Sequence, residues 1–267
     1  MNYHSNEWIA DKVQEHYNEA LHYYPKDKIV GIFYQGSGNY GLDTCNSDVD
    51  TKLLVLPTIE DLIFSRKPVG TTHVRKNEEH IDIKDVRSYI QLFRKGNINF
   101  VEILFTKYRI LNKDYEKEWL LLEAAREAIA RMNPYVTVKA MAGHAKAKFA
   151  SLEHRFSGKA DIIDKYGYDN KAFHHLLRIE DFLERYIEGE LYEQCLYPRH
   201  SEFLIWEKTN FRPLDEMRLM AEASLNHIKK MEETFCANNP NQENQVMLEF
   251  INGIQASIIK KSLKGEL

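Results

Sequence analysis

The pattern of apolar positions changes character along the chain. Near the N-terminus, apolar residues recur at spacings close to 3.6, which predicts an amphipathic helix with Ser5 or Asn6 as its cap. These apolar residues are Trp8, Ile9, Val13, Tyr17 and Leu21. Short apolar runs follow at residues 29–34, 51–56 and 80–83, and runs of this length are typical of strands.

From about Val86 onward the pattern is almost wholly helical. The clearest helical segments are residues 120–132, 136–156, 171–187, 214–234 and 243–259. Asn133-Pro134 interrupts this series, because the residue before a proline is disfavoured in the helical conformation. We therefore expect a small mixed α/β domain over residues 1–133 and an all-helical domain over residues 134–267.

The composition is typical of a globular protein with a proper core. Of the 267 residues, 43% are hydrophobic and 28% are charged, and the net charge is −4, so the chain is not basic throughout. The three cysteines have no metal-ligand spacing, and their odd number argues against a disulfide framework. No apolar run approaches the roughly 20 residues of a membrane helix, and the first residues lack the layout of a signal peptide. We therefore expect a cytoplasmic protein with no membrane partner.

A candidate site for phosphate chemistry follows the first predicted strand. Gly36-Ser37 comes directly after that strand, and ten residues separate it from Asp48-Val49-Asp50. Residues two apart on a strand face the same side, so Asp48 and Asp50 should project together. Two carboxylates this close repel each other unless a cation lies between them, and Mg²⁺ prefers one or two carboxylates together with phosphate oxygens. Because amides of a Gly-Ser turn favour an anionic phosphate, the arrangement suits metal-assisted phosphoryl or nucleotidyl transfer.

A third carboxylate, Asp82, stands between two isoleucines in a later apolar run. An acid in this setting is costly unless it is paired or binds a metal. Asp85 is the rival for the role, but strand alternation puts it on the opposite face from Asp82. We therefore expect Asp82, rather than Asp85, to join the Asp-x-Asp pair.

This order of motifs resembles the DNA polymerase beta-like nucleotidyltransferase superfamily. The run Gly-Ser-Gly-Asn-Tyr-Gly-Leu at residues 36–42, followed by Ser-Asp-Val-Asp at 47–50, is similar to one branch, the predicted nucleotidyltransferases of bacteria and phages associated with RNA repair. Residues 94–105 and 165–171, with His175 and Arg178 after them, are similar to two further stretches of that branch. The similarity runs in pieces from about Ile29 to Gly189.

The resemblance implies a polymerase beta-like α+β fold, in which a short mixed sheet is backed by helices and followed by a helical domain that closes the cleft. It implies that Asp48, Asp50 and Asp82 bind two Mg²⁺ ions, or Mn²⁺, and that Gly36, Ser37 and nearby amides hold the triphosphate. The implied reaction is in-line attack of an acceptor hydroxyl on the α-phosphorus of a nucleoside triphosphate such as ATP, with release of pyrophosphate.

A basic stripe marks the predicted helix 171–187. Lys171, His175 and Arg178 follow at i, i+4 and i+7 and share one face, and the opposite face is apolar and can pack. Such a stripe can bind triphosphate or nucleic-acid phosphate, or it can be a solvated face; the resemblance favours the first role and puts the helix across a cleft from the acids. Tyr168, in the turn before this helix, could stack on a base or anchor the turn.

The surrounding segment, residues 139–178, holds eight Lys and Arg residues against four Asp and Glu. Within it, His144, Lys146 and Lys148 interleave with alanines, which favours a basic helix that faces solvent.

Three functions stay open at this point. The first, which we favour, is transfer of a nucleotide to an RNA or tRNA end. The second is transfer to a protein side chain or a small molecule, as related enzymes do in toxin–antitoxin and resistance systems. The third is a non-catalytic nucleotide-binding module, and three clustered acids argue against it.

Overall fold

The computed structural model describes residues 3–76 and 78–264, and the chain divides into two compact units. The first unit comprises Met1–Met132 together with Glu243–Leu267, and the second comprises Asn133–Gln242. The first break lies beside Asn133, whose side chain accepts the N–H of Val136 and caps the following helix. The expected division differs at the other end, because the last helix belongs to the first unit rather than to the helical one.

The first unit is built on a mixed sheet whose five described strands run in the order β3-β4-β2-β1-β5. The strands are β1 (Ile29–Gln35), β2 (Asp50–Val55), β3 (Gly70–Val74), β4 (His80–Asp85) and β5 (Arg109–Leu111). β2 and β4 are parallel, and the other neighbouring strands are antiparallel. β1, β2 and β4 match the three predicted strands closely. β3 is an edge strand with mostly exposed residues, so it shows no apolar pattern from which it could be predicted.

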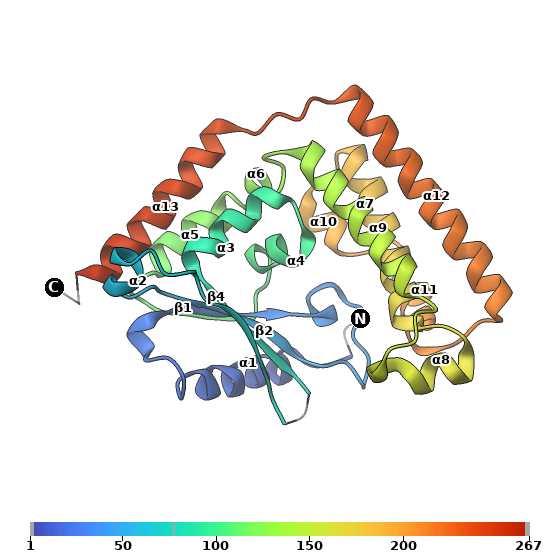
Figure 1. The fold of residues 1–267 in the computed structure, drawn as a ribbon, viewed down its shortest axis with the longest axis horizontal. Helices are drawn as coiled ribbons and strands as arrows, with labels where there is room; N and C mark the ends of the chain where they lie inside the picture. Colours follow the sequence, from blue (N-terminus) through green and yellow to red (C-terminus); the bar gives the residue numbers. More distant parts are fainter. Residues whose placement is uncertain (1–2, 77, 265–267) are drawn as a thin grey trace. The chain divides into compact units, whose positions relative to one another are not determined.

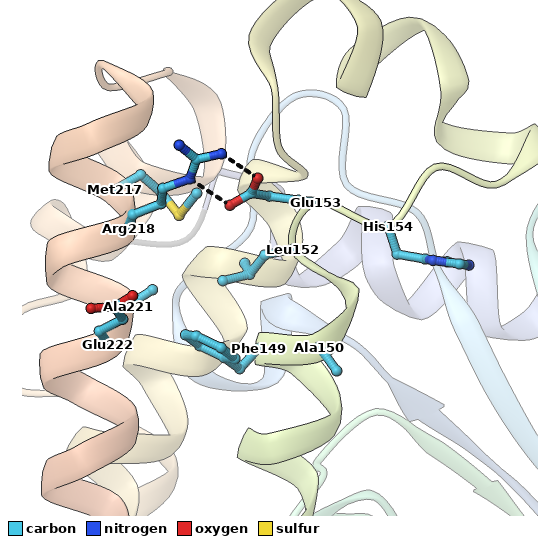
Figure 2. A pocket seen from close by; sticks show the side chains of 9 residues that line it. All are labelled: Phe149, Ala150, Leu152, Glu153, His154, Met217, Arg218, Ala221 and Glu222. Atoms are coloured by element: carbon cyan, nitrogen blue, oxygen red, sulfur yellow. Dashed lines mark hydrogen bonds and ion pairs between the residues drawn. The ribbon is translucent and has the colours of Figure 1, made fainter.

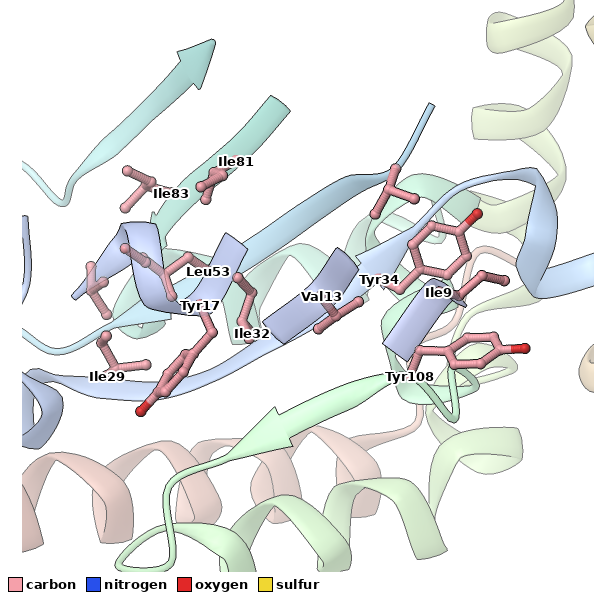
Figure 3. Close-up of a cluster of buried hydrophobic side chains, with 13 residues drawn as sticks. Ile9, Val13, Tyr17, Ile29, Ile32, Tyr34, Leu53, Ile81, Ile83 and Tyr108 are labelled. Atoms are coloured by element: carbon pink, nitrogen blue, oxygen red, sulfur yellow. The ribbon is translucent and has the colours of Figure 1, made fainter. Parts of the chain in front are cut away.

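Helix α1 (Asn6–Ala20) covers one face of this sheet (Figure 1). Its apolar side, Ile9 and Val13 among others, packs on inward-facing residues of three strands, such as Ile32, Leu53 and Ile81 (Figure 3). As predicted, Ser5 caps α1, because its side chain accepts the N–H of Trp8. Burial of this apolar surface is the main stabilising contribution to the sheet–helix layer.

The other face of the sheet carries α3 (Val86–Leu92), α4 (Ile98–Val101) and α5 (Glu116–Ala124), and α13 (Gln245–Leu263) packs on α3 and α5 (Figure 1). The Phe33 ring of β1 meets the Trp119 ring of α5 with centroids 4.2 Å apart. Gln91 of α3 donates to Asn252 and Gln255, which explains why α13 joins this unit. The shorter helical elements of the unit are η1 (Lys26–Lys28), η2 (Ser37–Tyr40), α2 (Ile59–Ile63), η3 (Phe93–Lys95), η4 (Glu102–Leu104) and α6 (Arg126–Ala130).

The described part of the second unit is helical, as predicted. It contains α7 (Pro134–Ser151), η5 (Ser157–Lys159), α8 (Ala160–Tyr166), α9 (Asn170–Glu188), α10 (Tyr192–Leu196), α11 (Ser201–Thr209) and α12 (Leu214–Asn238). α9 is central, because α7, α10, α11 and α12 all pack against it. Asp169 caps its start and Gly189, at φ +90°, ends it. Among the described residues, every helix is too short or too polar to cross a bilayer.

Candidate active site at the end of β1 and β2

The turn after β1 lies beside the start of β2. Gln35 at the end of β1 pairs with Asp50 at the start of β2, so the Gly36-Ser37 turn and the Asp-x-Asp motif meet at the same end of these two strands. The Ser37 hydroxyl donates to Oγ of Ser47 at 3.3 Å, which joins the turn to the residue before Asp48. The structure therefore brings together four of the predicted site residues, two from each motif.

Tyr34 fixes the shape of this turn. Its ring is buried, and its hydroxyl accepts the N–H of Gly38 at 3.1 Å. A Cβ atom at Gly36 would lie 2.8 Å from the Tyr34 hydroxyl oxygen, so the turn needs a glycine at this position. The amide of Asn39 donates to the Gly36 carbonyl at 3.1 Å. The backbone N–H groups of Gly38 and Asn39 thus form hydrogen bonds within the protein. The turn therefore offers fewer N–H groups to a phosphate than the sequence predicted.

Asp48 and Asp50 differ in their surroundings. Asp48 is exposed and forms no hydrogen bond or ion pair with any residue that the structure describes. Asp50 is 44% exposed, and its Oδ1 accepts the backbone N–H of His80 at 2.9 Å and the ring Nδ1–H of His80 at 3.1 Å. Because both hydrogen bonds go to Oδ1, they orient the carboxylate and leave Oδ2 open to a ligand.

Asp82 faces the same side of the sheet as Asp50 but lies further along the ladder. The register of β2 and β4 sets Lys52 opposite Asp82. Oδ2 of Asp82 accepts from Lys52 Nζ at 3.0 Å, and Oδ1 pairs with Lys84 Nζ at 2.9 Å. Burial acts to raise the pKa of Asp82, but the charges and hydrogen bonds of Lys52 and Lys84 lower it overall. Asp82 is therefore an ionised partner of two lysines.

The expected set of three acids does not form in the described structure. Within residues 3–76 and 78–264, no three His, Cys, Asp or Glu side chains are close enough to hold one metal ion. The reason is the register, which puts His80 beside Asp50 and sets Asp82 against Lys52, a residue only 3% exposed. His80 was missed, although strand alternation from Asp82 places it on the same face.

Asp85, the rival for the third acid, has a structural role. It is buried at the end of β4, where its side chain accepts the N–H of Arg87 at 2.7 Å and caps α3. The Arg87 guanidinium also donates to Oδ2 of Asp85, at 2.9 Å from Nε. Alternation predicted that Asp85 and Asp82 lie on opposite faces, and the ladder agrees.

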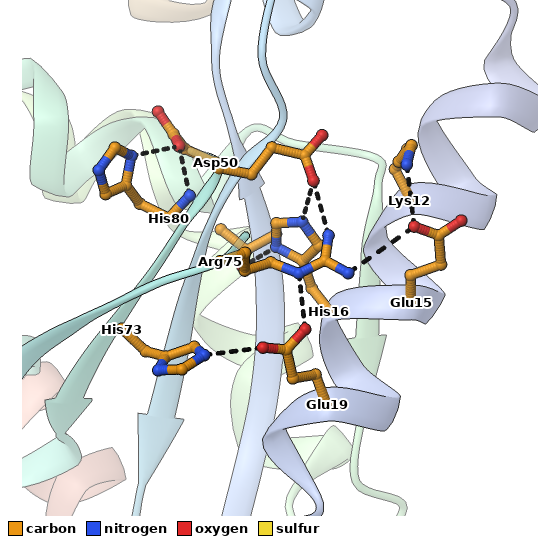
Figure 4. Close-up of polar contacts among 10 residues, drawn as sticks. Lys12, Glu15, His16, Glu19, Asp50, His73, Arg75 and His80 are labelled. Carbon is orange, nitrogen blue, oxygen red and sulfur yellow. Dashed lines mark hydrogen bonds and ion pairs between the residues drawn. The ribbon is translucent and has the colours of Figure 1, made fainter. Parts of the chain in front are cut away.

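A polar network supports Asp50 and His80 from the α1 side of the sheet (Figure 4). His16 of α1 is fully buried and bridges Thr51, at 2.9 Å from Nδ1, and Glu79, at 3.0 Å from Nε2. Burial lowers the pKa of His16 even though the hydrogen bond to Glu79 raises it, so the neutral ring donates through Nε2 and accepts through Nδ1. Thr51 follows Asp50 and Glu79 precedes His80 in the chain, so His16 fixes both strands beneath the Asp50–His80 pair.

Arg75 extends the network toward β3. Its guanidinium pairs with Glu79 at 2.6 Å and with Glu19 at 2.7 Å, and Glu19 in turn meets His73 Nε2 at 2.7 Å (Figure 4). The hydrogen bond from Arg75 lowers the pKa of Glu19. This chain of charged contacts ties α1 to β3 and β4.

Asp48 and Asp50 fit a hard divalent cation. One carboxylate is exposed and without a partner among the described residues, and the other has its Oδ2 open, while Mg²⁺ takes one or two carboxylates and completes its shell with water and substrate phosphates. Asp82 does not fit the same ion, because both of its oxygens are bound by lysine ammonium groups.

The three residues of the basic stripe differ in exposure, although their spacing predicted one shared face. Lys171 is exposed, His175 is partly buried and Arg178 is buried, whereas Leu176 and Ile179 pack as expected. Burial, together with repulsion from nearby cations, holds the pKa of His175 well below 6.5. His175 is therefore neutral at pH 7.

Tyr168 anchors its turn and offers no ring to a base. Its side chain is fully buried, and its hydroxyl accepts the N–H of Arg212 at 2.7 Å. Its ring packs edge-on against Phe173 and Phe211. Of the two roles that the sequence left open for Tyr168, the structure therefore favours anchoring the turn over stacking on a base.

A hollow in the second unit lies between the end of α7 and α12 (Figure 2). Its volume is about 440 Å³, and Phe149, Leu152 and Met217 give it an apolar floor. The Arg218 guanidinium and the Glu153 carboxylate form a two-bond ion pair over it, at 2.9 and 2.7 Å (Figure 2). None of the predicted site residues lines this hollow.

Comparison with known proteins adds little to this picture. No family model and no curated protein matches the chain. The chain is similar to the crystal structure of a nucleotidyltransferase-like protein from Exiguobacterium sibiricum 255-15, at 15% identity over 85% of this chain and 75% of that one, with a TM-score of 0.31. A likeness this distant carries no argument about activity.

Proposed function

We propose that the first unit transfers a nucleoside monophosphate from a nucleoside triphosphate to an acceptor hydroxyl. The observation that carries the proposal is the meeting of the Gly36-Ser37 turn with Asp48 and Asp50 at one end of β1 and β2. Open carboxylates beside a glycine turn are the setting that a divalent cation and a triphosphate require. The resemblance of these motifs to polymerase beta-like nucleotidyltransferases supports the same reaction.

In this proposal Asp48 and Asp50 hold Mg²⁺, with Mn²⁺ as a substitute, and Gly36 and Ser37 hold the triphosphate. The metal, when bound, supplies positive charge to the entering and leaving oxygens of the α-phosphorus. His80 is a positioning residue that orients the Asp50 carboxylate through its two hydrogen bonds. Asp82 holds Lys52 and Lys84 on the same face of the sheet and is not part of the metal set.

An RNA or tRNA end is the acceptor that we propose. The excess of Lys and Arg over Asp and Glu in residues 139–178 supports an anionic partner for the second unit. The resemblance to nucleotidyltransferases of RNA-repair type supports the same acceptor. Protein or small-molecule acceptors are the competing outcomes of the experiment.

The test is incubation of the full chain with each α-labelled nucleoside triphosphate and Mg²⁺, with total RNA and lysate protein offered together as acceptors. Transfer to RNA gives a labelled product that nuclease destroys and protease leaves intact. A protease-sensitive product would reassign the acceptor to protein while keeping the chemistry.

The controls separate chemistry from contamination. Asp48→Asn should remove labelling, because it removes an open carboxylate from the metal set, whereas Asp85→Asn should keep it, because Asp85 lies on the opposite face. Equal labelling by wild type and Asp48→Asn would refute the proposed site.

A further inference from the structure

His16 is a polar residue on the buried side of α1. Ile9, Val13 and Ala20 share that side and pack on the sheet, and His16 among them is fully buried. His16 follows Val13 by three positions and precedes Ala20 by four, so the helix turns its ring toward the same strands. An apolar residue would satisfy this pattern, and the reason for a histidine therefore lies in its polar contacts.

The two ring nitrogens of His16 contact two different strand ends. Nδ1 lies 2.9 Å from the Thr51 hydroxyl of β2, and Nε2 lies 3.0 Å from Oε2 of Glu79, the residue before β4 (Figure 4). The same oxygen of Glu79 accepts from Arg75 Nη1 at 2.6 Å. Because the Glu79 carboxylate accepts hydrogen bonds, His16 donates from Nε2 and accepts the Thr51 hydroxyl at Nδ1. We call these two contacts the His16 bridge.

The His16 bridge lies directly behind the Asp50–His80 pair. Side chains alternate along a strand, so Thr51 and Glu79 point to the α1 side of the sheet, whereas Asp50 and His80 point to the other side. The paired residues of β2 and β4 begin one position later, so this pair lies at the end of the ladder. At that end, the hydrogen bonds of Asp50 to His80 join the strands on one face, and the His16 bridge joins them on the other.

A buried polar bridge of this kind affects strand register more than stability. Apolar residues of similar size can often replace buried polar groups without a net loss of stability, whereas polar groups with fixed partners can specify one arrangement. A shift of one residue would move Thr51 or Glu79 to the other face of the sheet. Because His16 reaches both partners only when they lie side by side, the bridge selects the register that sets Asp50 beside His80.

We propose that His16 is a positioning residue for the metal, because the His16 bridge holds the ends of β2 and β4 so that Asp50 presents Oδ2 to the cation. This role rests on the proposed function, in which Asp48 and Asp50 hold the metal, but its test needs no catalysis. Replacing a residue that orients a metal ligand typically weakens metal binding by roughly ten- to a hundredfold. Helix α1, which carries none of the predicted site residues, thus sets the geometry of the site.

The experiment is titration of the full chain with Mn²⁺, in which electron paramagnetic resonance measures the free ion and no nucleotide is present. Thr51→Val removes the hydroxyl from the His16 bridge and keeps the size of the side chain, and it should weaken Mn²⁺ binding about tenfold. Thr51→Ser keeps the hydroxyl and should retain most of the affinity. Asp50→Asn shows how much of the Mn²⁺ binding belongs to the site.

Ser5→Ala is the matched control, because it destabilises the same helix without touching the His16 bridge. Ser5 caps α1 by accepting the N–H of Trp8 at 3.1 Å, and loss of such a cap weakens a helix. Its Mn²⁺ affinity should equal that of wild type. A general loss of stability in α1 would instead lower the affinity of Ser5→Ala and Thr51→Val alike.

A double variant separates positioning from folding. Thr51→Val alone leaves Nδ1 of His16 buried without its donor, which destabilises the protein. The double variant His16→Leu, Thr51→Val removes both polar groups, and Glu79 keeps its ion pair with Arg75. Its midpoint of urea unfolding should lie near that of wild type, because apolar groups replace the bridge. Its Mn²⁺ binding should still be about tenfold weaker.

Three outcomes would overturn the inference. They are Mn²⁺ binding in Thr51→Val that equals wild type, an equal loss of affinity in Ser5→Ala, or failure of both Thr51→Val and the double variant to fold, which would make the bridge a stabilising contact only. The proposed function fails separately, if wild type binds Mn²⁺ through Asp50 and depends on Thr51 but transfers no nucleotide. Nucleotide transfer by wild type, with unchanged Mn²⁺ affinity in Thr51→Val, would refute the inference and leave the proposed function standing.

Discussion

The acidic end of the sheet and the histidines that α7 and α9 contribute, His144 and His175, both gather titratable side chains, but their surroundings differ. At the sheet, the neighbouring strand supplies partners, since His80 binds Asp50 and two lysines bind Asp82. On α7 and α9, burial lowers the pKa of His144 and His175, and nearby cations lower both further. Asp82 is therefore neutralised within the protein, whereas Asp48 has no partner among the described residues, and the two histidines are held in their neutral form.

The two regions should therefore respond differently to metal and to pH. A metal at Asp48 and Asp50 replaces water around carboxylates that are already exposed or oriented, so it should add chemistry with little effect on folding. Acid at the two histidines forces charge onto partly buried rings, so it should destabilise the second unit.

The largest effect should come from the two open carboxylates. Asp50→Asn and Asp48→Asn should each abolish nucleotide transfer, because no third acid among the described residues joins them to compensate. The free energy of unfolding of Asp48→Asn should stay within about 0.5 kcal/mol of wild type, as for other exposed positions without partners. Turnover assays and urea denaturation measure the two quantities. A stable Asp48→Asn with full turnover would remove Asp48 from the site.

Asp82→Ala should destabilise the first unit by about 3 kcal/mol, because it leaves the buried Lys52 without its carboxylate. The double variant Asp82→Ala, Lys52→Met should recover part of this loss. The lowered pKa of Asp82 adds a pH dependence, in which its stabilising contribution is present above the unfolded pKa near 3.8 and is lost as the pH falls through the lower, folded value. If Asp82→Ala unfolds like wild type in urea, the lysine contacts contribute nothing measurable.

Gly36→Ala should destabilise the protein by about 2 kcal/mol, because the added Cβ would press on the buried Tyr34 hydroxyl at 2.8 Å. Transfer should fall with it, since the turn beside Asp48 would shift. Gly70→Ala is the matched control, because a Cβ there meets only Lys84 side-chain atoms at 3.8 Å or more. Equal stability of the two variants would show that the turn adapts freely.

Acid should destabilise the second unit through its neutral histidines. The folded pKa is about 3 for His174 and about 4 for His144, both below the unfolded value of 6.5. Their stabilising contribution is therefore complete above pH 6.5 and is lost as the pH falls toward these values, by about 1.4 kcal/mol for His174 at pH 5.5. Thermal melting from pH 7.5 to 5 should show the decline. A flat profile would mean that these rings are not held neutral.

Much of the fold could be predicted from the sequence, because its signals are local. The runs that became β1, β2 and β4 are apolar enough to be recognised, and Asn133-Pro134 marked the start of α7. β3 gave no such signal, since its residues are largely exposed, and α13 looked like part of a continuous helical series.

The site could be predicted only as far as its contacts are close in sequence. The pairing of Gln35 with Asp50 follows from a short antiparallel connection, so the Gly-Ser turn and the Asp-x-Asp motif were found together. The contact of Lys52 with Asp82 depends on the parallel register of β2 and β4, which no local pattern specifies. Likewise, Lys148 looked like a solvent-facing lysine until α9 packed beside α7.

Nucleotidyl transfer is distinguished from phosphoryl transfer by which phosphate of the nucleotide reaches the acceptor. Parallel reactions with α-labelled and γ-labelled nucleoside triphosphate, with Mg²⁺ and total RNA and lysate protein, compare wild type with Asp50→Asn. Attack on the α-phosphorus predicts that wild type attaches the α label and not the γ label, and that Asp50→Asn attaches neither. Attachment of the γ label, or an α-labelled product that survives Asp50→Asn undiminished, would contradict the account.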